Sequence, residues 1–336
     1  DLSNVLFITT ANDASHIPGP LYDRMDVIEL PSYTRVEKFN IARRHLLPKQ
    51  LKNNGLDGKV TMTSGAIYEI IDGYTREAGV RTVERTIGTI CRKVARRIVT
   101  EEDFKSYSVK PADLEDLLGP AKFAKDKEER RDEIGLVNGL AWTSVGGELL
   151  PIEVAVMNGT GKIQLTGSLG DVMKESATTA ITCIRTRAET LGISPDFYAK
   201  KDIHIHAPEG AVPKDGPSAG IAMATAVTSA LCEEPIAHDI AMTGEITLQG
   251  RVLPIGGLRE KSMAAYKNGM KTVIIPHGNI ADLAEVDQVV KDNVRFVPVR
   301  RIDEVLPIAM PGLLNRETKP NTPCPEPAHG VQTLRQ

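Results

Sequence analysis

The sequence predicts an α+β fold, in which helices and strands are mixed without the regular alternation of a βαβ chain. Two observations support this prediction. In the first third of the chain, apolar residues recur at helical spacing, most clearly over residues 81–100. After Ile134 the pattern changes to short runs typical of strands, with single helices between them.

The first third is expected to be mainly helical. The expected elements are a buried strand at 5–10 and helices at 35–47, 63–74, 81–100 and 111–119. The apolar face of the longest helix consists of Val83, Ile87, Ile90, Val94 and Ile98. Pro48 is expected to end the first helix, because proline has no N–H to donate to the preceding turn. The charged run 121–133 has little apolar content and is expected to be a solvated linker.

The remainder is expected to alternate irregularly between strands and helices. The expected strands are 136–145, 149–157, 162–167, 202–207, 240–246, 271–276 and 294–299. The expected helices are 171–191, the helix that follows Ser218, 258–268 and a last one ending at Met310. The tail from Asn315 contains four prolines and no apolar pattern, and is expected to be disordered.

The composition is that of a globular protein, with 41% apolar and 25% charged residues. A formal net charge of −3 gives no global basic field, so nothing in the sequence indicates DNA binding. No apolar run is long enough for a transmembrane helix. The four cysteines form no C-x-x-C pair and no zinc-ligand spacing, and three of them lie in apolar helical contexts as expected for reduced core residues of a cytosolic protein. The chain starts with Asp1 and runs at once into an apolar segment, which suggests a piece of a longer protein.

Ser218 lies where a loop rich in Pro, Gly and charge meets an apolar helix, within PEGAVPKDGPSAGIAMATAVTSALC. Taken locally, this position favours a helix N-cap over a nucleophile. The stretch GPSAG matches the G-x-S-x-G nucleophile elbow, but an elbow needs a strand that leads into the serine, and here the approach is a loop. A Ser-His-Asp site is a poor match too, because the downstream histidines have no convincing acid partner. These histidines are His238, His277 and His329.

Lys261 is another candidate activator of the serine. It follows a glycine pair in the first turn of a predicted helix, where the positive end of the helix dipole disfavours a lysine. A solvent-facing lysine is the ordinary interpretation. The unfavourable position suits a desolvated lysine better.

The motifs PKDGPSAG, around Ser218, and MTGEITLQGRVLPIGGLREK, ending at Lys261, resemble the serine and lysine motifs of the bacterial Lon proteases. The separation, 261 − 218 = 43 residues, fits that family, and the resemblance covers nearly all of the chain except the tail. It implies a Ser-Lys dyad that cleaves peptide bonds, with Ser218 as nucleophile and Lys261 as general base. It further implies that Thr243 helps to orient the lysine.

Asp215 and Glu245 also fall within these motifs. The resemblance makes them candidates for supporting the dyad, although either could equally be an ordinary loop charge.

The beginning of the chain resembles the end of an AAA+ ATPase module. Asn12 matches the sensor-1 asparagine, Arg24 the arginine finger and Arg81 the sensor-2 arginine. Without the resemblance, a turn residue and two surface charges would be the simpler interpretation. The implied organisation is the C-terminal end of an AAA+ α/β domain (1–30), an AAA+ small helical domain (31–120), a linker (121–133), a Lon-type protease domain (134–312) and a tail (313–336).

The sequence contains no G-x-x-x-x-G-K-[ST] phosphate loop and no Walker B acid. The run NGTGKI, 158–163, differs from the phosphate loop at both ends and is expected to be a hairpin turn. The chain as given is therefore not expected to hydrolyse ATP, and ATP with Mg²⁺ would act in the intact parent protein. The resemblance implies unfolded or damaged proteins as substrates, a homohexamer and a cytoplasmic location.

Two alternatives remain. One is a hydrolase, such as an esterase, that uses the elbow and a histidine, and the other is a non-catalytic assembly module. His204 and His206 point to one face of a predicted strand, where they could bind a metal ion, but a structural role is favoured because no third ligand is apparent.

Overall fold

The computed structural model describes residues 2–11, 17–28, 32–100, 106–123, 131–143, 146–208 and 214–315. The chain divides into two units, 1–32 and 33–336. The described part of the first unit contains one short helix, α1 (Gly19–Tyr22). The buried strand expected at 5–10 is wrong: Leu6 is 85% and Ile8 83% exposed. A strand needs a neighbouring strand for its backbone groups, and the described residues of this unit include none.

The second unit begins with helices α2 (Arg35–Ile41) and α3 (Leu47–Asn53), joined without a break by a π-helical turn, Ala42–Leu46. The expectation that Pro48 ends this helix is wrong. Pro48 lies in the first turn of α3, where the π-helical turn has changed the hydrogen-bond register and a missing N–H costs little. Thr34 caps the start of α2 through its side chain, together with Glu37.

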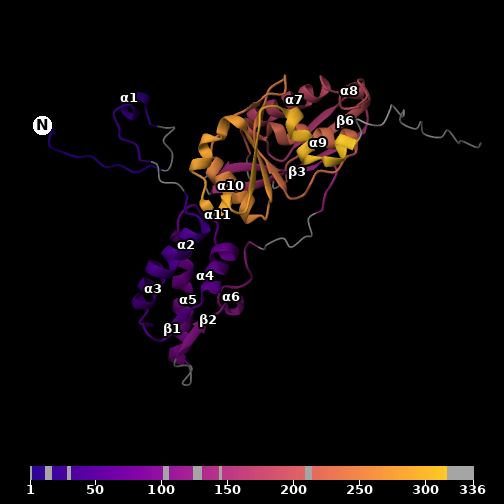
Figure 1. Ribbon diagram of the computed structural model, residues 1–336. Helices are drawn as coiled ribbons and strands as arrows, with labels where there is room; N and C mark the ends of the chain where they lie inside the picture. Colours follow the sequence, from indigo (N-terminus) through magenta and orange to yellow (C-terminus); the bar gives the residue numbers. More distant parts are fainter. Residues whose placement is uncertain are drawn as a thin grey trace, which may run out of the picture. The chain divides into compact units, whose positions relative to one another are not determined.

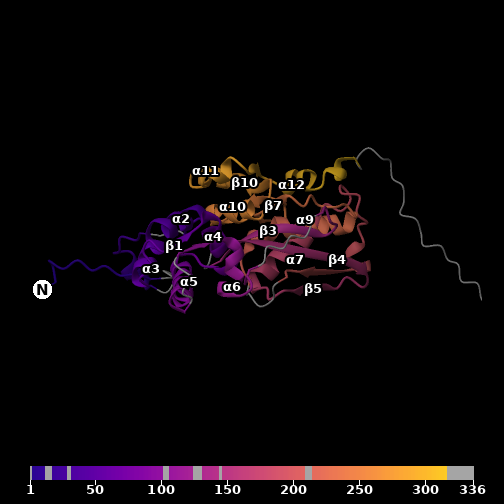
Figure 2. The same ribbon diagram turned by 90° about the horizontal axis from the view of Figure 1, so that it is seen from below.

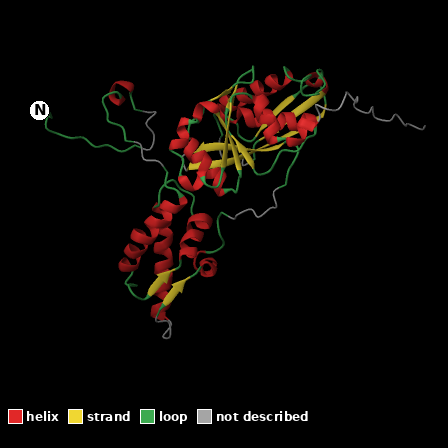
Figure 3. Ribbon diagram, in the orientation of Figure 1, coloured by secondary structure: helices red, strands yellow, loops and turns green. Residues whose placement is uncertain are grey.

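The helical part continues as β1 (Val60–Met62), α4 (Ser64–Glu69), a π-helical turn (Ile70–Tyr74), α5 (Arg81–Thr100), β2 (Tyr107–Val109), a 3-10 turn (Pro111–Asp113) and α6 (Leu114–Leu118). Strands β1 and β2 pair in parallel (Figure 3). The predicted apolar faces are confirmed: Ile67, Ile70 and Ile71 of the second helix are buried, as are Val83, Ile87, Ile90 and Val94 of α5, whereas Ile98 is partly buried.

The rest of the unit is organised by a seven-stranded sheet in the order β11-β10-β7-β3-β4-β6-β5. The strands are β3 (Leu136–Thr143), β4 (Gly146–Asn158), β5 (Ile163–Thr166), β6 (Lys201–His206), β7 (Ile240–Met242), β10 (Thr272–Pro276) and β11 (Arg295–Val299). Only β4 runs antiparallel to its neighbours. A separate pair, β8 (Glu245–Ile246) and β9 (Val252–Leu253), follows β7.

Both faces of the sheet are covered, because alternate residues of one strand enter different cores. In β10, Ile274 packs with helices α7 (Asp171–Arg185), α9 (Gly220–Cys232) and α12 (Ile302–Ala309). Its neighbours Val273 and Ile275 pack with α10 (Leu258–Lys267) and α11 (Gln288–Lys291). Figures 1 and 2 both show α10 and α11 side by side. The short helix α8 (Phe197–Lys200) precedes β6. The α+β prediction is confirmed.

The run 158–163 is a turn, but not a hairpin as expected. Strands β4 and β5 do not pair with each other, because β6 lies between them. The turn is held instead by Asp202 at the start of β6, whose Oδ1 accepts hydrogen bonds from Thr160 N and Lys162 N, each 2.8 Å long. The sequence could not show that a later strand would enter between these two.

Three cysteines are buried in the core, as predicted: Cys91, Cys183 and Cys232. Burial raises the pKa of Cys91 to about 11 and also raises that of Cys183. Because the thiolate is the reactive form, we expect a small alkylating reagent at pH 7.5 to leave these three residues unmodified in the folded protein and to label them after denaturation. Peptide mapping by mass spectrometry measures this, and rapid labelling of one of them in the folded state would contradict the described core.

Candidate functional site

A cavity of about 340 Å³ opens between three segments: the β3–β4 hairpin, the turn that leads into α9, and residues 254–261. Ser218 and Lys261 both line it. Its apolar wall includes Leu140, Trp142, Leu149, Met173, Pro254 and Ile255. The structure therefore brings the two predicted catalytic residues into one cavity, although 43 residues separate them in the chain (261 − 218).

Ser218 lies in a 3-10 turn, Pro217–Ala219, immediately before α9. Gly216 has a φ of 118°, in a region that favours glycine, and this allows the sharp entry into the turn. The N-cap interpretation of Ser218 is wrong: Ala219 occupies the N-cap position of α9, with no side-chain cap. The Ser218 hydroxyl is half-buried and forms no hydrogen bond with any residue that the structure describes.

Gly220 is required for packing at the start of α9. A Cβ at this position would lie 2.8 Å from Ile246 N, so the missing side chain lets α9 pack against β8. A backbone hydrogen bond joins Ser218 to the segment that precedes β8: Gly244 N donates to Ser218 O at 2.8 Å.

Lys261 lies in the first turn of α10, and the residue is only 3% exposed. Burial lowers its pKa from 10.5 to about 8, because an apolar environment disfavours the ammonium form. Burial accounts for this lowering of the pKa, and among the described residues no carboxylate raises it in opposition. The predicted desolvated lysine is thus present in the structure.

Thr243 follows β7 and is fully buried. It connects Lys261 to residues 214–219, the segment that contains Ser218 and is called the serine turn below. Its Oγ1 accepts a hydrogen bond from Lys261 Nζ at 3.2 Å and donates one to Ser218 O at 3.3 Å. Within the described residues, Lys261 Nζ makes no hydrogen bond to Ser218 Oγ. The side chain of Lys261 is therefore held beside the serine turn through Thr243.

Asp215 lines the same cavity and supports the turn that contains Ser218. Its Oδ1 accepts hydrogen bonds from Met173 N at the start of α7 (3.1 Å) and from Gly216 N (2.9 Å). Glu245 lies in β8, paired with Leu253, and does not line the cavity. Neither carboxylate forms an ion pair with Lys261 within the described part of the chain.

Of the three residues matched to nucleotide binding, two lie within the described part of the chain. Asn12 lies outside the described residues. Arg24, after α1, and Arg81, the first residue of α5, are exposed, and neither side chain pairs with another described residue.

The described histidines do not line the cavity, and His329 lies outside the described residues. His238 does have an acid partner, contrary to expectation, because its Nδ1 lies 2.6 Å from Asp132 Oδ1. It does not line the cavity around Ser218. His277 Nε2 lies 2.6 Å from an Arg300 nitrogen.

His204 and His206 share one partner, since Thr166 Oγ1 lies 2.9 Å from the first ring and 2.7 Å from the second. In the described ranges, no group of three or more His, Cys, Asp or Glu side chains is placed to hold a metal ion.

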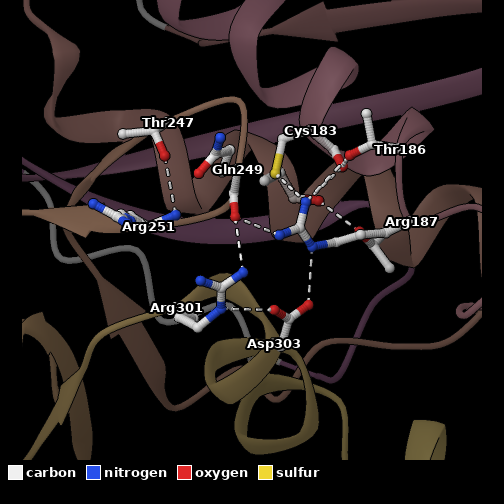
Figure 4. Close-up of polar contacts among 10 residues, drawn as sticks. Cys183, Thr186, Arg187, Thr247, Gln249, Arg251, Arg301 and Asp303 are labelled. Atoms are coloured by element: carbon white, nitrogen blue, oxygen red, sulfur yellow. Dashed lines mark hydrogen bonds and ion pairs between the residues drawn. The ribbon is translucent and has the colours of Figure 1, made fainter.

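Sequence reasoning missed the contribution of α7 and of an arginine at its end. Arg187 joins three segments (Figure 4): it donates to Asp303 Oδ1 at 2.9 Å, to Cys183 O at 3.1 Å and to Gln249 O at 2.6 Å. Gln249 belongs to the turn between β8 and β9, which connects Thr243 to the cavity wall. No signal in the sequence distinguishes Arg187 from an ordinary arginine at a helix end.

The β3–β4 hairpin touches the lysine helix directly. A Cβ at Gly147 would lie 1.9 Å from Glu260 O and 2.9 Å from Lys261 N. Trp142 of the same hairpin packs on Gly257, the residue that precedes α10. The position of Lys261 therefore depends on backbone contacts as well as on its own burial.

None of the described helices is both long and apolar enough to span a membrane.

Comparison with known proteins identifies the family. The model of the Lon protease (S16) C-terminal proteolytic domain matches residues 108–312, and that of the Lon protease AAA+ ATPase lid domain matches 52–107. Lon protease of Trichlorobacter lovleyi is 54% identical over 311 residues, which are 92% of this chain and 38% of that protein. Lon protease of Escherichia coli K12 is 53% identical over 311 residues, 92% of this chain and 40% of that protein.

Lon protease of Haemophilus influenzae is 52% identical over 330 residues, 96% of this chain and 41% of that protein. The chain spans about two fifths of the length of these relatives. The family model that matches more than half of the residues contains both Ser218 and Lys261. The chain therefore belongs to the Lon protease (S16) family.

Proposed function

We propose that this chain carries a peptide-bond hydrolase site in which Ser218 is the nucleophile and Lys261 the general base. The observation that supports this best is the buried lysine itself. It lines the same cavity as the Ser218 hydroxyl, which bonds to none of the described residues, and its pKa is lowered to about 8. A lysine can accept a proton near neutral pH only if its pKa is lowered in this way.

The proposed reaction begins with neutral Lys261, which donates one N–H to Thr243 Oγ1 and keeps its lone pair for the Ser218 proton. As the proton moves to Nζ, Ser218 Oγ attacks the carbonyl carbon of the substrate. The proton then passes to the leaving amine, and an acyl ester remains on Ser218. Water hydrolyses the ester, with Lys261 again as base. The N–H of Ser218 has no acceptor within its own helical turn and is a candidate donor to the oxyanion.

Asp215 and Glu245 have no role in proton transfer in this proposal. Asp215 holds the serine turn against α7, and Glu245 lies in the strand that continues from Thr243. The missing hydrogen bond between Ser218 Oγ and Lys261 Nζ means that the serine must rotate toward the lysine, or the turn must shift, before catalysis.

The cavity favours substrates with an apolar side chain next to the cleaved bond. Its wall contains Trp142, Leu149 and Ile255, which would cover an apolar side chain and leave a charged one without partners. Such side chains are exposed in unfolded proteins. This supports unfolded or damaged proteins as the substrate class.

The remaining features concern the whole protein, of which this chain represents about two fifths by comparison with its relatives. On the basis of the family, we extend the proposal to ATP-dependent proteolysis in a cytoplasmic homohexamer, with Asn12, Arg24 and Arg81 acting on ATP and Mg²⁺ in the intact parent protein. The division into the end of an AAA+ domain, a small helical domain, a linker, a protease domain and a tail belongs to the same proposal.

Replacing Ser218 with Ala tests the nucleophile. We expect loss of peptide hydrolysis by at least about 10³-fold, because the residual site can bind but not acylate. Turnover of a fluorogenic peptide measures the loss, and far-UV circular dichroism with a melting curve verifies the fold. Ser229→Ala is less suitable as a control, because Ser229 Oγ accepts from Gly135 N in the core. Thr178→Ala is the better control, since this exposed hydroxyl bonds only within α7. Undiminished activity of Ser218→Ala would eliminate the dyad.

Replacing Lys261 with Met tests the base. The folded-state pKa of about 8 lies below the unfolded value of 10.5, so below pH 8 the folded protein bears the full cost of a buried ammonium. This cost is roughly 2.5 × 1.36, or about 3 kcal/mol, and it disappears as the pH rises from about 8 to 10.5. We expect Lys261→Met to be inactive, yet more stable than the parent at pH 7, with the advantage shrinking toward pH 10.5.

Denaturant unfolding at several pH values measures this difference, and the exposed Lys271→Met is the matched control. The parent's peptidase activity should rise with pH to a plateau around an apparent pKa of about 8. An inactive Lys261→Met that is markedly less stable at pH 7 would instead identify Lys261 as a charged structural residue.

A further inference from the structure

The serine turn is attached to the first turns of α7 at several points. Gly170 N donates to Lys214 O at 2.7 Å, and Met173 N donates to Asp215 Oδ1 at 3.1 Å. Further along α7, Ser176 Oγ donates to Pro217 O at 3.3 Å. This last contact is the one nearest to the nucleophile, because Pro217 O belongs to the peptide group that joins Pro217 to Ser218.

Ser176 is buried, with 8% exposure, at the point where α7 meets the start of α9. A Cβ at Gly220 would lie 3.1 Å from its Oγ, so the hydroxyl fills the space that this glycine leaves. Pro217 O also accepts the N–H of Gly220 within the 3-10 turn. Two donors, one from each helix, therefore fix the direction of one carbonyl.

A trans peptide group is planar, and its C=O and N–H point in opposite directions. All described peptide bonds are trans. Because the Pro217 carbonyl is directed at Ser176 on α7, the N–H of Ser218 is directed away from α7. This N–H has no acceptor within its own helical turn, since the turn begins at Pro217.

We propose that Ser176 is a positioning residue for the reaction: its hydroxyl fixes the Pro217–Ser218 peptide group so that the Ser218 N–H is oriented to stabilise the oxyanion. The inference rests on the proposed Ser-Lys hydrolysis and adds a residue outside both sequence motifs. Loss of the hydroxyl leaves Pro217 O bonded to Gly220 N, so no buried carbonyl is left unpaired and the fold is retained. The peptide group then gains freedom to rotate, and the donor is oriented correctly for less of the time.

The test compares Ser176→Ala with the parent. Loss of an oxyanion donor lowers kcat by about 10²-fold to 10³-fold in serine proteases, and a donor that is misoriented but present should cost less. We expect kcat to fall about 10-fold to 100-fold, with KM changed less than about twofold. Ser176→Cys, which keeps a weak donor of similar shape, should lie between Ser176→Ala and the parent.

A second readout separates orientation from general packing. A peptide boronic acid forms a tetrahedral adduct with a serine nucleophile and needs the oxyanion donor, whereas the same peptide as a carboxamide does not. In Ser176→Ala the affinity for the boronic acid should fall by the same factor as kcat/KM, and that for the carboxamide should be unchanged. Thr228→Val is the matched control: it removes a buried hydroxyl that bonds Ala224 O within α9, away from the serine turn.

The outcomes are distinguishable from those of the proposed function. If the parent is inactive or Ser218→Ala is active, the Ser-Lys proposal fails, and this inference fails with it. If Ser218→Ala is inactive while Ser176→Ala retains the parent's kcat and boronic acid affinity, only the role of Ser176 is overturned. Equal losses in Ser176→Ala and Thr228→Val, accompanied by equal shifts in melting temperature, would also overturn it, since they indicate packing alone.

Discussion

The site depends on one hydroxyl group that serves two partners. Thr243 Oγ1 has a single proton, which it gives to Ser218 O, and it offers its lone pairs to Lys261 Nζ. The residue comes directly after a central strand of the sheet, and its own N–H donates to Ile274 O of the neighbouring strand. The lysine and the turn that contains Ser218 are thus both connected to the central sheet through Thr243. A valine at this position would keep the volume but leave a buried lysine without a hydrogen-bond partner.

Burial of the Lys261 ammonium group is unfavourable for folding, and the proposed reaction requires it. The surrounding structure must therefore supply the free energy that this burial costs. Apolar residues on both faces of the sheet provide most of it, since α7, α9 and α12 pack on one face and α10 and α11 on the other. Hydrogen bonds complete the support at the edges of the site. Arg187 holds the β8–β9 turn, and Asp215 holds the approach to Ser218.

Much of this could be predicted from local pattern. Helical periodicity located α5, and the odd placement of a lysine near a helix start indicated a desolvated Lys261. The sequence could not show which strands pair, because pairing depends on distant segments: β6 enters between β4 and β5 only after a long intervening helix. The prediction that Pro48 ends a helix was wrong because a π-helical turn precedes it. The proline therefore lies in the first turn of α3, where its missing N–H costs little. Ser176 carries no signal at all, since its effect depends on a carbonyl 41 residues away.

The contact between Gly147 and the backbone of α10 restricts which residues this chain can carry in the β3–β4 hairpin. The hairpin strand lies so close to Glu260 O that no side chain, not even a methyl group, fits at position 147 without moving the helix that carries Lys261. The two elements therefore cannot change independently, because any shift of the hairpin is transmitted to the backbone of Lys261. A hairpin that carries neither Ser218 nor Lys261 thereby limits where the lysine side chain can lie.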